Sequence, residues 1–145
     1  MTDKRIDKSR SGHTYGSYRY EVSRVKIEEY AAAAGFELPP ARQDAPVVAP
    51  NIFAACFTVM TGAGLLRGDE QLGGAGAIVH AGQEYDFHRR VASGEVLRCT
   101  PTITEIVDRG AHTYLTLEIV CVDEESSEPV VTSRQTIAYL GAAAS

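Results

Sequence analysis

Hydrophobic and polar residues alternate along the second half of the chain, and this pattern predicts β-strands. Apolar and polar side chains alternate in two stretches, where the apolar positions are Leu97, Cys99, Ile103 and Val107 in the first and Leu115, Leu117, Ile119 and Cys121 in the second, with mostly threonine, arginine and glutamate between them. Such alternation gives each strand one face for a core and one face for water. A third long strand is predicted over Val130–Leu140, and Asp108–Gly110 and Asp123–Ser127 have the composition of the intervening hairpin turns.

An earlier strand is predicted within Ile78–Leu97, which reads IVHAGQEYDFHRRVASGEVL. From Gln83 to Arg89, apolar or aromatic residues recur within a charged run, as in a half-buried strand. Ala92–Gly94 has the composition of a turn, and the next strand begins at Glu95.

The first half of the chain predicts a short strand and two helices. The strand covers Tyr18–Val22, and Ser23 is a suitable N-cap for a helix over Arg24–Ala34 that Gly35 ends. The second helix, Asn51–Leu66, is apolar on nearly every side, which predicts that it is buried all round.

The loops around this second helix are marked by proline and glycine. Three prolines within Phe36–Val48 exclude a regular helix or a central strand, so the segment is predicted to be a covering loop. Pro50 suits the first turn of the helix, and the glycine-rich Arg67–Gly76 returns the chain to the sheet.

The predicted order is therefore strand, helix, buried helix and a meander of four strands. One apolar helix and an antiparallel meander pack best when the sheet curls around the helix, which is the α+β hot-dog fold. Open strand edges in such a sheet favour pairing with a second copy, so we expect a dimer.

Length, charge and hydropathy limit the number of domains and the kinds of partner. The 145 residues suit one domain, expected over 18–141, with a polar tail at 1–17 that is predicted to be disordered and a short tail at 142–145. The net charge of −5, without clustered Lys and Arg, argues against a nucleic-acid surface. No apolar run reaches the length of a signal peptide or a membrane span, so no membrane partner and a cytoplasmic location are expected.

Three stretches of the chain, in this order, resemble the MaoC-like (R)-specific enoyl hydratase and 3-hydroxyacyl dehydratase family of the hot-dog superfamily. Tyr20–Val22 with Ile27–Ala31 is similar to the family's opening strand and helix. Val48–Phe53 is similar to its Ala-Pro-x-x-Phe start of the central helix. His80–Leu97 resembles its His-Gly-x-Gln and His-Arg-Pro segment, from which Ala81 and Arg90 depart.

The resemblance is to the acyl-binding, non-catalytic half of that family. Catalytic members carry Asp-x-Asn-Pro-x-His in the loop before the central helix, where a carboxylate and an imidazole handle the α-proton and the departing water. In this chain the corresponding residues, Gly35–Ala49, contain no histidine, and Asp44 is not followed by Asn-Pro.

What the resemblance implies is a subunit that binds a β-hydroxyacyl or enoyl thioester of coenzyme A or an acyl carrier protein, in fatty acid or polyketide metabolism. It would form a homodimer, or a heterodimer with a catalytic hot-dog partner that supplies Asp and His. The substrate-binding candidates lie at the start and along one stripe of the central helix: Pro50, Asn51, Phe53, Phe57 and Met60.

Two other interpretations remain open. A stand-alone hot-dog enzyme, such as a dehydratase, thioesterase or secondary-metabolite tailoring enzyme, could use His80, Asp86 and His88, since Asp86 and His88 are two apart on one strand. Its thioesterase version could use Asp69 or Glu70 beyond the central helix. A binding or scaffold protein without turnover is the third interpretation.

No cofactor or metal is implied by the residues. The four histidines and three cysteines lack the spacing of metal ligands, and the glycines at 73, 74 and 76 lack the strand-to-helix context of a phosphate loop. Cys56, Cys99 and Cys121 are expected to be buried thiols.

Overall fold

The computed structural model describes residues 5–40, 42, 44–73 and 77–141. Residues 1–4 and 142–145 of the expected tails lie outside the described residues, as do residues 74–76 of the expected glycine-rich loop. In chain order the elements are η1 (Lys8–Arg10), β1 (Tyr18–Glu21), α1 (Arg24–Ala34), η2 (Asn51–Ala54), α2 (Ala55–Gly68), β2 (Ile78–Phe87), β3 (Val96–Arg109), β4 (His112–Asp123) and β5 (Pro129–Tyr139).

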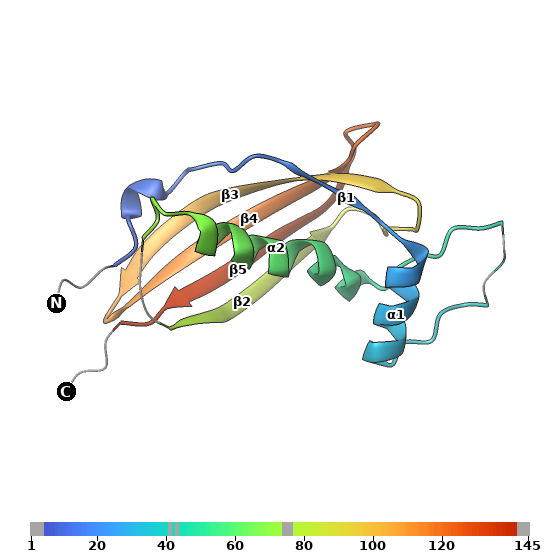
Figure 1. The fold of residues 1–145 in the computed structure, drawn as a ribbon, viewed down its shortest axis with the longest axis horizontal. Helices are drawn as coiled ribbons and strands as arrows, with labels where there is room; N and C mark the ends of the chain where they lie inside the picture. Colours follow the sequence, from blue (N-terminus) through green and yellow to red (C-terminus); the bar gives the residue numbers. More distant parts are fainter. Residues whose placement is uncertain (1–4, 41, 43, 74–76, 142–145) are drawn as a thin grey trace.

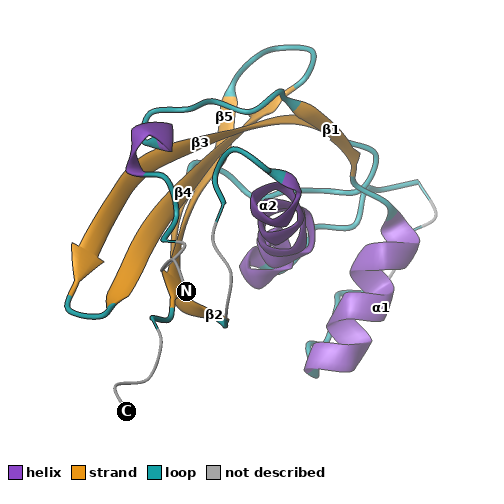
Figure 2. Cartoon of the chain, turned by 60° about the vertical axis from the view of Figure 1, so that its left-hand side comes forward, coloured by secondary structure: helices purple, strands orange, loops and turns teal. Residues whose placement is uncertain are grey.

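One antiparallel sheet curls around the central helix. The strands are ordered β1-β3-β4-β5-β2, and α2 runs along the concave face, with α1 beside it (Figure 1). Viewed close to its axis, α2 lies within the curve of the sheet (Figure 2). Alternate residues of β4, including Leu115, Leu117 and Ile119, are fully buried beneath it. The predicted arrangement of a sheet wrapped around a central helix is confirmed.

The predicted meander of four strands is wrong in one respect, because it contains only β3, β4 and β5. Strand β2 does not pair with β3, its successor in the chain; it pairs with β5, with Gln83 opposite Gln135 and Tyr85 opposite Ser133. The alternating pattern reports which face of a strand is buried and carries no information about its neighbours. As a result β2 forms a free edge of the sheet.

The prediction that the central helix is buried all round is also wrong for the single chain. Phe53, Phe57 and Leu66 are buried toward the sheet, but Ile52 is exposed and Met60 has 73 % of its surface exposed. A helix against one concave sheet buries one side and its flanks, so the opposite side stays open unless another chain covers it.

The caps of α1 are those that the sequence predicted. Ser23 Oγ accepts a hydrogen bond from Lys26 N at 3.0 Å, which satisfies one of the free amides at the start of the helix. Gly35 ends the helix in the left-handed conformation, with φ 76°.

The N-terminal segment differs from the expected disordered tail, because residues 5–17 lie along the outer edge of β3. Gly12 N donates to Ile103 O at 2.7 Å, and Tyr15 N donates to Pro101 O at 2.9 Å. Strand β1 pairs only with the first residues of β3, so the rest of this long strand would present open backbone groups. The polar segment covers that edge through its backbone, which its composition could not reveal.

Candidate functional site

A small cleft lies at the start of the central helix. The preceding loop is fixed to the turn after β2, because Ala49 N donates to Val91 O and Val47 N donates to Ser93 Oγ, both at 2.8 Å. The cleft holds about 10 Å³, the space of one water molecule. Its lining is Ala49, Pro50, Asn51, Phe53, Ala54, Phe87, Arg89 and Val91.

The structure brings three of the five substrate-binding candidates together at this cleft: Pro50, Asn51 and Phe53. Phe57 lies deeper in the core, with its ring centroid 5.1 Å from that of Tyr20. Met60 lies on the open side of α2. The substrate-binding stripe predicted along one face of the central helix is therefore divided between the core and the surface.

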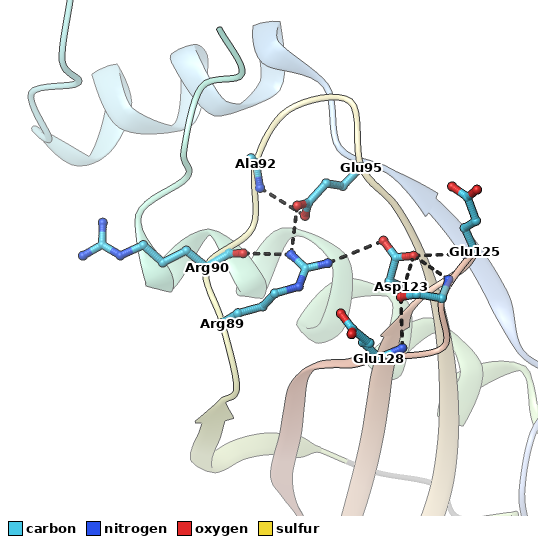
Figure 3. Close-up of polar contacts among 8 residues, drawn as sticks. Arg89, Arg90, Ala92, Glu95, Asp123, Glu125 and Glu128 are labelled. Carbon is cyan, nitrogen blue, oxygen red and sulfur yellow. Dashed lines mark hydrogen bonds and ion pairs between the residues drawn. The ribbon is translucent and has the colours of Figure 1, made fainter.

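Arg89, at the edge of the cleft, is held by two carboxylates (Figure 3). Its Nη1 donates to Glu95 Oε1 at 2.8 Å and to Arg90 O at 3.0 Å, and its Nη2 lies 3.5 Å from Asp123 Oδ2. Hydrogen bonds from the Ser126 amide and hydroxyl and the nearby Arg89 charge lower the pKa of Asp123, although burial acts in the opposite direction. Arg89 thus ties the turn after β2 to the β4–β5 hairpin.

The catalytic candidates of the alternative interpretation are engaged in other contacts. Asp86 pairs with Arg134 at 2.7 Å, and Arg134 also pairs with Glu118 at 3.1 Å, so the carboxylate belongs to an ion-pair row across three strands. His88 follows the last residue of β2, and its amide donates to the backbone of β5. His80 Nε2 lies 3.0 Å from Gly82 O. Among the described hydrogen bonds, none joins the three candidates.

A buried polar cluster lies between α2 and the β5–β2 pair, and sequence reasoning missed it. Thr58 Oγ1 donates to Ala54 O at 2.8 Å. Because this bond uses the one hydrogen of the Thr58 hydroxyl, Tyr85 Oη is the donor in the 3.1 Å hydrogen bond to Thr58 Oγ1. Gln83 Nε2 donates to Ser133 Oγ at 2.8 Å. Gln135, the cross-strand neighbour of Gln83, is fully buried.

The two glutamine amides of this cluster are incompletely paired. Gln83 Oε1 and both amide atoms of Gln135 are buried without a hydrogen-bond partner among the described residues. Gly62 of α2 faces this position so closely that a Cβ there would lie 2.3 Å from Gln135 Nε2. The glycine therefore provides the space that the Gln135 amide occupies.

A second, open groove lies between the end of α2 and the N-terminal segment, where Asp69 is the most enclosed carboxylate. Arg10 Nη2 donates to Asp69 Oδ2 at 2.8 Å and Tyr15 Oη donates to it at 2.6 Å. Burial raises the pKa of Asp69, but these donors and the Leu72 amide outweigh it and the pKa is lowered. With its oxygens taken, Asp69 anchors the N-terminal segment and has no free lone pair aimed at the groove. Glu70, the other thioesterase candidate, is exposed on the groove's rim.

No three His, Cys, Asp or Glu side chains within the described ranges are placed to hold a metal ion. Cys99 and Cys121 are buried cross-strand neighbours, and their mutual hydrogen bond, with burial, raises the pKa of Cys121. Cys56 is half-buried, and burial raises its pKa also. Over the described part of the chain, no helix is long and apolar enough to cross a membrane.

Comparisons with known proteins agree with this fold. A family model described as the FAS1-like dehydratase domain region matches residues 9–133. A UPF0336 protein of Thermobifida fusca is 34 % identical over 135 residues, covering 87 % of this chain and 88 % of the relative.

Solved structures extend the comparison to proteins of the same fold. A chain of the HadBC (3R-hydroxyacyl-ACP dehydratase) complex from Mycobacterium tuberculosis superposes with a TM-score of 0.75 at 20 % identity, covering 92 % of this chain and 98 % of that one. A MaoC-like dehydratase superposes with a TM-score of 0.77 at 23 % identity, covering 93 % of this chain and 43 % of its longer chain. The hot-dog fold and the MaoC-like resemblance are thus confirmed, and the chain belongs to the family of the FAS1-like dehydratase domain region.

Proposed function

We propose that this protein is an acyl-thioester-binding subunit of a hydratase or dehydratase, and that it works with a catalytic hot-dog partner in the cytoplasm. The observation that carries the proposal is the loop before the central helix, where Gly35–Ala49 contains no histidine and Asp44 is exposed. A dehydratase of this family needs an acid and a base at that place. A partner's Asp and His would supply them.

The free edge of the sheet supports the need for a partner. Strand β2 pairs on one side only, and its Ile78, Val79 and Phe87 are exposed, as is Met60 on the open side of α2. An apolar edge strand next to an open helix favours docking of another sheet edge, which satisfies its backbone groups. A homodimer or a heterodimer would cover the same surface.

The cleft at the helix start supports acyl-thioester binding. Its lining combines apolar side chains with Asn51, the first residue of the helix, and the unpaired backbone amides of a first helical turn favour a group that carries partial negative charge, such as a thioester carbonyl. Coenzyme A and acyl carrier protein present the same carbonyl, so the proposal covers either carrier.

The stand-alone enzyme is less well supported. Asp86 pairs with Arg134 on the outer face of the sheet, and His80 contacts the backbone of its own strand. Catalysis by Asp86 or His80 would need these contacts to break.

Titration of the purified protein with trans-2-dodecenoyl-coenzyme A, followed both calorimetrically and by the absorbance of the conjugated double bond, tests the proposal. Heat of binding without loss of absorbance is expected. Loss of absorbance that disappears with Asp86→Ala or His88→Ala would instead support the stand-alone enzyme.

A further inference from the structure

Two arginines follow one another at the edge of the cleft, and only one of them is neutralised by the protein. Arg89 donates to Glu95 and lies beside Asp123, so two carboxylates balance its charge. The Arg90 side chain is exposed, and its guanidinium makes no hydrogen bond or ion pair with a described residue. Figure 3 shows it pointing away from the carboxylates that hold Arg89. The charge and the donors of Arg90 are therefore left for a group outside the chain.

The backbone places Arg90 at the mouth of the cleft. Both of its neighbours in sequence line the cleft. Val48 and Ala92 form an antiparallel bridge, and the same register brings Arg90 opposite Pro50, which caps the start of the central helix. Since consecutive Cα atoms are about 3.8 Å apart and an extended arginine side chain reaches about 7 Å, the guanidinium stands within roughly 11 Å of the backbone that lines the cleft.

The carrier of a thioester has an anion at a matching distance. Coenzyme A and acyl carrier protein both hold the thioester on a phosphopantetheine arm, and this arm ends in a phosphate. Roughly thirteen bonds separate the thioester sulfur from the phosphorus, so at about 1.2 Å per bond an extended arm spans roughly 16 Å. A guanidinium roughly 11 Å from the cleft meets a phosphate about 4 Å beyond it, and the planar group can donate two parallel hydrogen bonds to the phosphate oxygens.

We propose that Arg90 binds the phosphate at the end of the phosphopantetheine arm and makes the protein select thioesters carried on that arm over thioesters of uncharged thiols. The inference rests on the proposed acyl-thioester binding and adds a residue that recognises the carrier. Because coenzyme A and acyl carrier protein share this phosphate, Arg90 serves both. It contacts the carrier alone, so it leaves the preference for the acyl chain unchanged.

Calorimetric titration of the purified full-length protein with three trans-2-dodecenoyl thioesters tests the proposal: those of coenzyme A, phosphopantetheine and pantetheine. The phosphopantetheine thioester is expected to bind about fivefold more tightly than the pantetheine thioester, with little further gain from coenzyme A. This advantage should shrink in about 0.5 M salt, which screens an exposed ion pair.

Three outcomes of this titration would overturn the inference. Equal affinities for the phosphopantetheine and pantetheine thioesters would show that the arm's phosphate is not recognised. An advantage that appears only with coenzyme A would assign recognition to the nucleotide part of that carrier. Failure of every thioester to bind would overturn the proposed function together with the inference.

Three variants connect the phosphate to Arg90. Arg90→Gln should abolish the fivefold advantage while the affinity for the pantetheine thioester and the thermal midpoint stay unchanged, because the side chain is exposed and unpaired in the free protein. Arg90→Lys should keep part of the advantage, since lysine retains the charge without the planar pair of donors. An advantage that survives Arg90→Gln contradicts the proposal.

Arg67→Gln is the matched control. Arg67 is also exposed and without an ion pair to any residue that the structure describes, but it lies about 18 Å along α2 from the first residue of that helix. This variant should keep the full advantage. Loss of the advantage in Arg67→Gln as well would show that the overall charge of the protein, and not a site at Arg90, attracts the phosphate.

Discussion

The contact between Gly62 and Gln135 makes a quantitative prediction about stability. A methyl group added at Gly62 would lie 2.3 Å from Gln135 Nε2 and 3.0 Å from Leu117 Cδ2, whereas one added at Gly64 meets no atom within 4 Å. Both glycines lie inside α2, where alanine stabilises a helix by about 1 kcal/mol relative to glycine. At Gly64 this gain should appear in full.

At Gly62 the gain should be reversed. Forcing a methyl into a filled core costs about 1–3 kcal/mol, because buried side chains must leave their preferred positions. Gly62→Ala should therefore be about 2 kcal/mol less stable than Gly64→Ala. Urea unfolding followed by circular dichroism, with equal m-values for the two variants, measures the difference.

Positions 62 and 135 should also be coupled in their effects on stability. Shortening Gln135 to alanine removes the closest contact, so Gly62→Ala should become at least about 1 kcal/mol more favourable in that background than in the parent chain. The reasoning is refuted if Gly62→Ala stabilises the parent chain as much as Gly64→Ala does.

Three further predictions follow from other contacts. Asp69→Asn should lower stability by about 2 kcal/mol near pH 7, because charge-assisted hydrogen bonds from the N-terminal segment weaken. Since the folded-state pKa of Asp69 is lowered, this stabilisation is present above the ordinary carboxyl pKa and is lost as the pH falls through the lowered pKa, so the difference between the melting temperatures of the two proteins should shrink as the pH falls below the ordinary carboxyl range. In the native protein a disulfide reagent should label Cys56 slowly and leave Cys99 and Cys121 unlabelled, whereas all three should be labelled in urea. Mass spectrometry counts the labelled cysteines, and fast labelling of Cys121 in the native protein would contradict its burial. Val79→Asp places a charge on the exposed edge of β2, so it should shift a dimer toward monomer in sedimentation experiments. A dimer of unchanged mass would exclude that edge as the interface.

The parts of the fold that the sequence predicted are those whose signals are local. Alternation in β3 and β4, the Ser23 cap and the end of α1 at Gly35 each depend on a few neighbouring residues, and each prediction agrees with the structure. The pairing of β2 with β5 and the edge position of residues 5–17 depend on distant backbone partners, which periodicity does not report.

The buried amides were hidden from the sequence for a related reason. In β5 the outward Arg134 and Thr136 and the inward Ser133 and Gln135 are all polar, so the alternation that reveals an inner face is lost at this place. Only the structure shows that Gln135 points under α2, opposite Gly62. Pro50, Asn51 and Phe53 lie together because they surround the start of one helix, and their role in substrate binding stays a prediction.

Hydration of an enoyl thioester, with and without a partner, tests the central claim most directly. The purified protein, a hot-dog subunit from the same organism that carries Asp-x-Asn-Pro-x-His, and their mixture are compared for loss of the conjugated double bond of trans-2-dodecenoyl-coenzyme A. We predict no turnover by this protein alone and a mixture that is faster than the partner alone, with all activity lost when the partner's motif histidine is replaced by alanine. Clear turnover by this protein alone, or a mixture no faster than the partner, would contradict the account.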